Sequence, residues 1–556
     1  MLDAQGRFSD AAEFASSAFL SPAATVWGGP PVARKVATHC DEKALDAVFA
    51  SVDQSHLPGV VAGIALDGVP VYRKGFGRAN IELPTLLTPA MRLRIGSSSK
   101  HFASLAYMLL CEEGLAGIDD EVGQHVPGLG PVNARVTMRQ LMGHVSGIRD
   151  LLSVTMLFNG IGRPVTDQEM IAYYRTIEDV DFEPGKRWSY NNGGYILLSA
   201  AIETITGQRL QDVLRERIFV PVGMHDTALR RWDQDFLPNS ATLHFRDGKG
   251  AWSRTYMGME ISGAGGIVST IDDMLRWLGH MDAPFIGSPQ TWHQMLEPHM
   301  LENGHSTHYG LGLFTQDYRG LKVIHHPGTV MGGNFQMIAV PEARLHIAIG
   351  ANRSDVSAIA LAHNVIDACV EGLAPLPDMR VQEKRTGIFR SPRDGRIIGL
   401  SASEDTQMLS IDGAAPIPVT PDDTGMLQLP PAASFLQQSI RIDGDAIVHR
   451  DFGNEDRLVE IDTDPQARLG RYAGTYRSQD MDTTFELSED GDGAQARSHG
   501  RHGWATYVAT PISADIWRLE DRLSGTIGAV ITFEPDASGF VLDFGRLRHV
   551  RFGKVG

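Results

Sequence analysis

A serine and a lysine three positions apart are the strongest chemical signal in the chain. Ser97 and Lys100 lie in RIGSSSK, which precedes HFASLAYMLLCEEG, a stretch with one apolar helical face that ends near Gly114. An i,i+3 spacing places both side chains on one face of a helix. Burial lowers the pKa of an amine, which lets it polarise a serine hydroxyl. We therefore expect Ser97 to be a nucleophile activated by Lys100.

Two later segments carry polar side chains that suit the same chemistry. Tyr190 and Asn192 form a Y-x-N pattern in PGKRWSYNNGGY. A tyrosine held near two cations can be a phenolate and act as a general base, and an asparagine amide can bind a substrate carbonyl. His326 and Gly328 form an H-x-G pattern in LKVIHHPGT, which we expect to be a strand. Alternation along that strand sends His325 to the opposite face, so we expect it to be structural.

Each pattern also has an ordinary structural explanation. A plain helix start, a buried tyrosine, a turn asparagine and a core histidine are the alternatives for Ser97 with Lys100, Tyr190, Asn192 and His326 respectively. His144 is expected to be a structural residue at a helix end. The glycines of 263–266 favour close backbone approach, because the Lys-Ser/Thr of a phosphate-binding loop is absent. Adjacent histidines on a strand diverge, which disfavours a metal site.

Taken in order along the chain, these patterns resemble those of the serine β-lactamase and penicillin-binding-protein clan. The phrases VTMRQLMGHVSG and YGLGL support the likeness, which covers about residues 42–370. Within that clan the chain is most similar to the D-aminopeptidase group, whose members add two C-terminal β-barrels. The resemblance implies an α+β fold, in which a β-lactamase-like domain with an antiparallel sheet flanked by helices precedes two small antiparallel β-barrels.

The resemblance also implies roles for the residues of the site. Ser97 would be acylated, while Lys100 and Tyr190 would share the proton transfers. Asn192 would help to place the scissile amide. The backbone N–H groups of Ser97 and Thr329 would form the oxyanion hole, where losing one donor costs other hydrolases ~10²–10³ in rate. No metal and no organic cofactor is implied, and the resemblance suggests a homodimer.

The H-x-G pattern departs from that of β-lactamases, which usually carry a lysine where this chain has His326. A lysine there helps to hold a substrate carboxylate, whereas a histidine is largely neutral at pH 7. The change weakens the case for β-lactams or terminal carboxylates as preferred substrates and favours peptides, amides or esters. Pro327 lacks an N–H group, but Gly328 and Thr329 remain able to contact the substrate.

Changes in composition and in hydrophobic pattern along the sequence divide it into domains. We expect an N-terminal extension over 1–40, a catalytic domain over 41–372 and a Pro-containing linker over 371–379. Short alternating segments separated by Asp, Gly and Pro then predict β-barrels over 380–465 and 466–556. The two barrels resemble copies of one unit, since GIFRS at Gly387 matches GTYRS at Gly474 and an LS pair follows each at the same distance. Chance similarity is the alternative.

Bulk properties exclude some classes of function. A net charge of −17 argues against a nucleic-acid surface, which needs clustered Lys and Arg. Three cysteines in no ligand spacing make a disulfide framework improbable. The sequence has no run of ~18 apolar residues for a membrane span and no signal-peptide pattern at its start. We therefore expect a cytoplasmic protein that binds neither membrane nor nucleic acid.

These observations predict a serine amidohydrolase that cleaves short peptides or amino-acid amides containing D-residues. The alternatives are a carboxylesterase or weak β-lactamase on the same scaffold, or a catalytically silent peptide-binding protein. Similar D-aminopeptidases insert a loop of the last domain into the mouth of the active site. The segment SHGRHGW, residues 498–504, is our candidate for that loop, with a surface hairpin as the equal alternative.

Overall fold

A computed structural model describes residues 36–232, 234–377, 384–403, 406–422, 424–491, 493–521 and 528–555. Most of the predicted extension, residues 1–35, lies outside this description. Its last residues join the catalytic domain, because Thr38 bridges Val370 and the His39 N–H donates to the Cys369 carbonyl at 2.8 Å. No helix within the described ranges is long and apolar enough to span a bilayer.

The catalytic domain is built on one antiparallel sheet with strand order β10-β11-β12-β13-β1-β2. Its strands are β1 Val60–Leu66, β2 Val69–Phe76, β10 Phe314–Tyr318, β11 Leu321–Val330, β12 Gly333–Val340 and β13 Leu345–Ala351. The first two form the hairpin expected from the sequence, since Asp67 and Gly68 turn with φ of 54° and 78°. Segments from both ends of the domain therefore share one sheet.

Helices cover both faces of this sheet. α1 (Glu42–Phe49) and α13 (Ala358–Cys369) pack on one face, where Ile64 of β1 and its partner Ile347 of β13 are fully buried. α11 (Ile271–Asp282) packs on the other face. At Gly63 a Cβ atom would lie 2.2 Å from the Ile271 side chain, so glycine is needed for α11 to approach the sheet.

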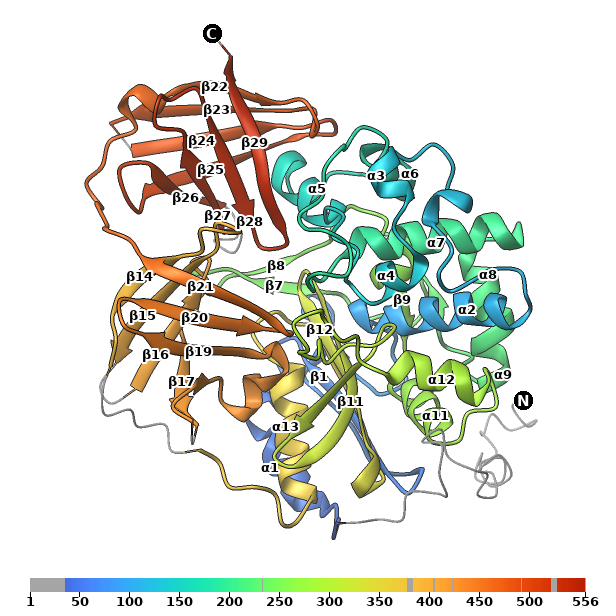
Figure 1. Cartoon of the computed structure of the whole chain (residues 1–556). Helices are drawn as coiled ribbons and strands as arrows, with labels where there is room; N and C mark the ends of the chain where they lie inside the picture. The colour runs from blue at the N-terminus through green and yellow to red at the C-terminus, as the bar shows by residue number, and fades with distance from the viewer. Residues whose placement is uncertain are drawn as a thin grey trace, which may run out of the picture.

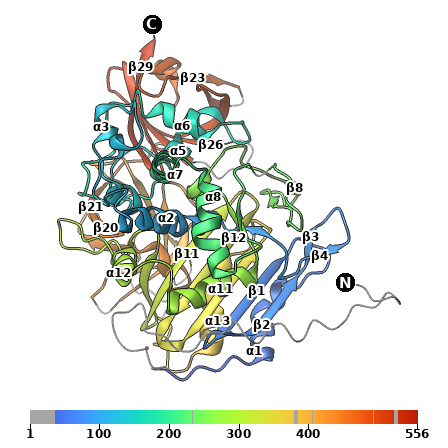
Figure 2. The same ribbon diagram turned by 90° about the vertical axis from the view of Figure 1, so that its right-hand side faces the viewer.

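A helical region stands beside the sheet, as Figures 1 and 2 show. At its centre α2 (Lys100–Glu112) packs against α7 (Asn192–Thr206), and most side chains of both helices are buried. The other helices are α3 Pro131–Ala134, α4 Met138–Met142, α5 Leu151–Asn159, α6 Asp167–Tyr173, α8 Leu210–Leu214, α9 Val220–Val222, α10 Ser262–Gly265 and α12 Pro289–Leu296. Short strand pairs complete the domain: β3 Arg78–Asn80 with β4 Thr85–Leu86, β5 Leu93–Arg94 and β6 Ala228–Leu229 with β9 Ile267–Ser269, and β7 His244–Arg246 with β8 Trp252–Arg254.

Two closed antiparallel barrels follow, each with its eight strands in sequence order. The first contains β14 Gly387–Arg390, β15 Ile397–Ser403, β16 Thr406–Ile411, β17 Ile417–Pro421, β18 Leu427–Gln428, β19 Gln438–Asp443, β20 Ala446–Asp451 and β21 Asn454–Glu460. The second contains β22 Gly474–Ser478, β23 Thr483–Asp490, β24 Gly493–His499, β25 Trp504–Pro511, β26 Ile516–Asp521, β27 Gly528–Phe533, β28 Gly539–Phe544 and β29 Leu547–Val555. The barrels are the two expected from the sequence.

The barrels have the same internal register at the positions that match in sequence. Gly387 pairs with Leu400 in the first barrel, and Gly474 pairs with Leu487 in the second. The two segments that look alike are therefore the first strands of two domains with one topology, and the similarity between them has a structural basis.

Both barrels dock on the catalytic domain (Figure 1). Phe158 at the end of α5 enters the second barrel, with its ring 6.0 Å from that of Phe485 and 5.9 Å from that of Phe552. In the first barrel, Phe452 stacks on Trp188 of the catalytic domain at 4.0 Å between ring centroids. Aromatic side chains thus anchor each barrel next to the segments that carry Tyr190 and Asn192.

Candidate active site

A cavity of about 680 Å³ lies where the three domains meet and contains Ser97, Tyr190, Asn192 and His326 in its wall. Its lining is mainly apolar and comes from all three domains, including Met156, Met257, Phe314, Phe435, Leu436 and Phe452. Such a volume accommodates a small ligand. The structure therefore brings together residues that the sequence places more than two hundred positions apart.

Ser97 lies in a short 3₁₀ turn, Gly96–Ser99, that leads directly into α2. The Lys100 Nζ is 3.2 Å from the Ser97 Oγ, so the two side chains share one helical face as their spacing predicts. A close backbone approach holds the turn in place: a Cβ atom at Gly328 would lie 1.8 Å from the Ile95 carbonyl. Glycine is also favoured at Gly96, where φ is 52°.

Lys100 is fully buried, with two further oxygens close to its amine. The Nζ donates to the Asn192 Oδ1 at 2.8 Å and to the Ala264 carbonyl at 2.6 Å. Burial holds the pKa of Lys100 well below its usual value, and the guanidinium of Arg546 lowers it further, while Asp150 opposes the shift. The amine is thus disposed to be neutral, as a proton acceptor must be.

The Tyr190 ring lies between two basic side chains, with the Lys100 Nζ 4.6 Å and the Arg546 guanidinium 4.3 Å from its centroid. Its hydroxyl is buried and makes no hydrogen bond of good geometry to a described residue, although Ser97 is close enough to favour the phenolate. Burial nevertheless raises the pKa of Tyr190, against the effects of Arg546 and Ser97. The resting tyrosine is therefore a neutral phenol, beside the Arg546 guanidinium and an amine that becomes a cation only when it accepts a proton.

His326 is buried and fixed by two hydrogen bonds. Its Nε2 lies 3.1 Å from the Tyr309 hydroxyl, and its Nδ1 lies 2.7 Å from the Pro327 carbonyl, which can only accept. The Nδ1 therefore carries the proton, and Tyr309 donates to the Nε2. Burial, with Lys100 nearby, holds the pKa of His326 well below its usual range. The residue is neutral, as expected from its type.

The strand that carries His326 is positioned to supply a backbone donor. β11 pairs with β10 only as far as His325, so the stretch from His326 to Thr329 has no strand partner on that side. The Ser97 turn fills this side, since a Cβ atom at Gly96 would lie 2.9 Å from the Thr329 nitrogen. The Ser98 hydroxyl also donates to the His326 carbonyl at 2.7 Å. Ser97 of the turn and Thr329 of the strand both line the cavity.

Asn192 opens α7, and buried polar groups hold its backbone. The N–H groups of Asn192 and Gly193 donate to the Asp150 Oδ1 at 2.9 and 3.2 Å. The Asn191 N–H donates to the Nδ1 of His144 at 3.0 Å, which gives His144 a positioning role. His325 contacts the Gln316 and Gln336 amides, at 2.9 and 3.2 Å, and does not line the cavity.

The segment of the second barrel that reaches the cavity is not the one expected from the sequence. Residues 498–504 pack against the end of α5, where the His502 N–H donates to the Asn159 Oδ1 at 3.0 Å, and none of them lines the cavity. Gly545 and Arg546, in the turn between β28 and β29, line it instead. The prediction that residues 498–504 reach the active site is wrong, because the backbone of this segment is hydrogen-bonded to the end of α5.

Sequence reasoning missed Tyr309, Asp150 and Arg546. Tyr309 opens the YGLGL phrase, but nothing in that phrase indicates that its hydroxyl contacts His326. Asp150 carries no signal beyond its place before α5. Arg546 lies in an Asp-Phe-Gly-Arg turn that resembles any hairpin turn. Only the docking of the second barrel shows that this turn faces the site.

Comparisons with known proteins agree with this architecture. The Beta-lactamase family profile matches residues 44–369. D-aminopeptidases from Brucella ovis and Brucella anthropi are each 25% identical over 86% of this chain, which spans 91% and 90% of their lengths.

Two solved structures share the fold. The octameric penicillin-binding protein homologue from Pyrococcus abyssi superposes with a TM-score of 0.52 at 23% identity, covering 92% of this chain and 98% of its own. The D-amino acid amidase from Ochrobactrum anthropi SV3, in complex with L-phenylalanine amide, superposes with a TM-score of 0.51 at 23% identity, covering 59% and 98%. The profile match spans more than half of the sequence, and the chain therefore belongs to the β-lactamase family, as a serine hydrolase with two C-terminal β-barrels.

Proposed function

We propose that this serine hydrolase is an amidohydrolase that cleaves short peptides or amino-acid amides containing D-residues, through an acyl-enzyme on Ser97. The observation that carries the proposal is the buried Lys100 amine 3.2 Å from the Ser97 hydroxyl, in a cavity large enough for a small peptide. The names of the D-aminopeptidase relatives, whose alignment covers 86% of this chain, support the substrate class.

Lys100 is the first proton acceptor in this mechanism. A neutral amine has two N–H donors and one lone pair, and the Asn192 Oδ1 and the Ala264 carbonyl accept the two donors. The lone pair is then left for the Ser97 hydroxyl, which donates its proton as the Oγ attacks the scissile carbonyl. Serine needs such a base because its hydroxyl is a weak nucleophile.

The tetrahedral intermediate is stabilised by the backbone N–H groups of Ser97 and Thr329. Donors fixed before the reaction stabilise the developing negative charge without reorganisation. Lys100 is an ammonium once it has taken the Ser97 proton. Tyr190, a neutral phenol, then passes its proton to the leaving nitrogen and recovers one from Lys100. Water then hydrolyses the acyl-enzyme by the same groups in reverse order.

Assays of three substrates test this proposal. We expect purified protein to hydrolyse D-Ala-p-nitroanilide faster than L-Ala-p-nitroanilide, and Ser97→Ala to lose activity by at least roughly 10³-fold. Ser410→Ala, at a half-buried serine of the first barrel that is not in the cavity wall, is the control and should retain full activity. A fluorophosphonate probe should label the wild type and not Ser97→Ala.

A carboxylesterase is the second candidate, favoured by the apolar lining of the cavity and the neutral His326. Hydrolysis of p-nitrophenyl butyrate alone would establish it and reject the peptidase. A protein that neither turns over substrate nor reacts with the probe would be a silent binding protein. The homodimer and the cytoplasmic location stay predictions.

A further inference from the structure

The charges in the wall of the cavity are unbalanced. Three charged side chains line it: Arg396, Asp451 and Arg546. Arg396 and Asp451 form an ion pair with each other, and Asp451 also accepts from the Asn454 amide at 2.8 Å. Arg546 has no carboxylate within ion-pair distance among the described residues, and its one contact is with the Tyr190 ring. The cavity therefore carries a positive charge without a counter-charge.

The fold holds this charge in place. Arg546 is at the tip of the turn between β28 and β29, next to Gly545 with φ of 47°. Two residues further on, Arg548 is buried and donates to the Gly545 carbonyl and to Asp412 of the first barrel, both at 2.8 Å. The turn is thereby pinned by the first barrel, and the exposed guanidinium projects over Tyr190 (4.3 Å to the ring centroid).

A cavity of this charge favours an anionic substrate. Among the described residues of the wall the only carboxylate is that of Asp451, and it is already paired with Arg396. No acidic side chain in the described wall is free to hold a substrate ammonium. An arginine on an apolar wall binds a carboxylate with two parallel hydrogen bonds.

We propose that Arg546 is a specificity-determining residue that binds the C-terminal carboxylate of the leaving residue, so that the preferred substrates are short peptides ending in a free carboxylate. This inference rests on the proposed function. Tyr190 passes its proton to the leaving nitrogen, and the carboxylate of a terminal residue is two bonds from that nitrogen. A guanidinium over the Tyr190 ring is therefore on the side of the site where this carboxylate lies.

The charge of Arg546 changes what the neutral His326 implies about substrates with a terminal carboxylate. A neutral histidine in the H-x-G pattern indicated that terminal carboxylates were disfavoured, because the lysine charge was lost. Arg546 supplies a positive charge to the same cavity from the second barrel. The chain keeps a cation for the substrate carboxylate but carries it on another domain.

Matched substrates test the proposal: D-Phe-D-Ala, its C-terminal N-methylamide, and D-Phe-p-nitroanilide, assayed at the alkaline plateau of the pH profile. We expect wild type to prefer the free acid. Arg546→Gln should lower kcat/KM for the acid, mainly through KM, by roughly ten- to hundredfold more than for the two uncharged leaving groups. Arg546→Lys should lie between. Arg551→Gln, an exposed arginine on β29, is the control and should match wild type.

Calorimetry with the Ser97→Ala protein separates binding from catalysis. D-Phe-D-Ala should bind this protein more tightly than the N-methylamide does, and Arg546→Gln should remove the difference. Equal losses on all three substrates, or no loss on the acid, would overturn the role of Arg546 and leave the proposed function intact. Failure of wild type to hydrolyse any of the three would reject the proposed function, and the calorimetric difference would still decide whether Arg546 binds the carboxylate.

Discussion

At the scale of single residues, burial sets the protonation states on which the proposed chemistry depends. Lys100, Tyr190 and His326 are all moved toward their neutral forms, because each would carry its charge away from water. Hydrogen-bond partners then fix what each neutral group can do: Lys100 retains a lone pair for Ser97, whereas His326 uses both ring nitrogens in contacts with Tyr309 and Pro327.

The pH dependence of Ser97 reactivity tests this arrangement. Lys100 must be deprotonated to accept the proton, so labelling by an uncharged fluorophosphonate should slow as the pH falls through the lowered pKa of Lys100. Arg546 contributes to that lowering, so in Arg546→Gln the pKa of Lys100 rises and the acidic limb should move to higher pH. The measurement is the labelling rate constant against pH for both proteins. A limb that stays in place, or moves to lower pH, would contradict a neutral Lys100 tuned by Arg546.

At the scale of elements, the segment before α7 is held by the first barrel as well as by its own domain. The turn between β20 and β21 places Asn454 against Trp188: the Trp188 N–H donates to the Asn454 Oδ1 at 3.0 Å, and the Asn454 Nδ2 donates to the Trp188 carbonyl at 2.8 Å. Phe452 stacks on the Trp188 ring. Trp188 is two residues from Tyr190, so the barrel acts as a support for the site.

Removal of the Asn454 side chain should therefore affect both stability and catalysis. Asn454→Ala leaves two buried backbone groups of Trp188 without partners, and we expect the free energy of unfolding to fall by about 1–3 kcal/mol. The value of kcat/KM should fall as well, because the Tyr190 segment loses its support. Urea denaturation and steady-state kinetics measure the two effects. Asp445→Ala, at a side chain 96% exposed in the same barrel, should change neither. Lost stability with unchanged kcat/KM would show that Tyr190 is positioned without the barrel.

Local spacing made part of this site predictable. The Ser97–Lys100 contact follows from an i,i+3 step on a helix, and the β1–β2 hairpin follows from its Asp-Gly turn. The strand that carries His326 and the two barrels follow from alternation. The contacts of Asn454 and Arg546 depend on how separately folded domains dock, and no period in the sequence encodes that. The same limit explains the error at 498–504, where an unusual composition indicated a loop but not the surface it covers.

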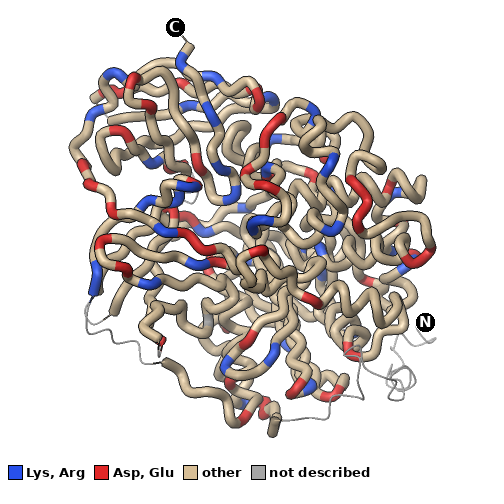
Figure 3. The backbone as a smooth tube through the Cα atoms, in the orientation of Figure 1, with Lys and Arg blue, Asp and Glu red and all other residues tan. Residues whose placement is uncertain are grey.

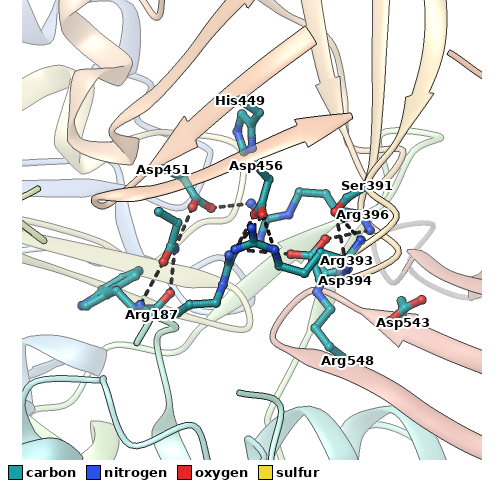
Figure 4. A network of polar contacts seen from close by, with 12 residues as sticks. Arg187, Ser391, Arg393, Asp394, Arg396, His449, Asp451, Asp456, Asp543 and Arg548 are labelled. Atoms are coloured by element: carbon teal, nitrogen blue, oxygen red, sulfur yellow. Dashed lines mark hydrogen bonds and ion pairs between the residues drawn. The ribbon is translucent and has the colours of Figure 1, made fainter. Parts of the chain in front are cut away.

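At the scale of the whole molecule, a buried ion network joins the three domains. Figure 3 shows basic and acidic residues side by side where the barrels meet the catalytic domain, and Figure 4 shows the network in detail. Arg187 of the catalytic domain pairs with Asp456 and reaches Asp394 at 3.6 Å, both in the first barrel. Arg548 of the second barrel pairs with Asp412 of the first at 2.8 Å.

Within this network, the charged state of Asp451 is favoured at neutral pH. Burial alone would raise the pKa of Asp451, but Arg396 lowers it to about 2. A carboxylate with a lowered pKa contributes stability above its unfolded pKa of ~3.9, and that contribution is lost as the pH falls toward 2. The Asp451–Arg396 pair in the cavity wall therefore keeps its contribution at neutral pH.

Arg187 provides the sharpest test of the junction, because an exposed pair in the same barrel serves as its control. The Arg187 and Asp456 side chains are only 14% and 4% exposed, whereas Arg450 and Glu455 form an ion pair with each side chain 40% exposed. Removing one partner of a buried pair leaves the other charge uncompensated, so Arg187→Gln should lower the free energy of unfolding by about 3 kcal/mol. Arg450→Gln should change it by about 0–1 kcal/mol, since water screens an exposed pair.

Arg393 also contacts Asp456, at 3.2 Å, but its side chain is 61% exposed and can compensate only in part. Urea denaturation followed by tryptophan fluorescence measures both variants, and limited proteolysis shows whether the first barrel separates first. Loss of D-peptidase activity in Arg187→Gln at urea concentrations that leave the second barrel folded would show that the junction maintains the site. Equal effects of the two arginine variants would mean that the network does not hold the domains together, and that the aromatic contacts of Trp188 and Phe158 do so instead.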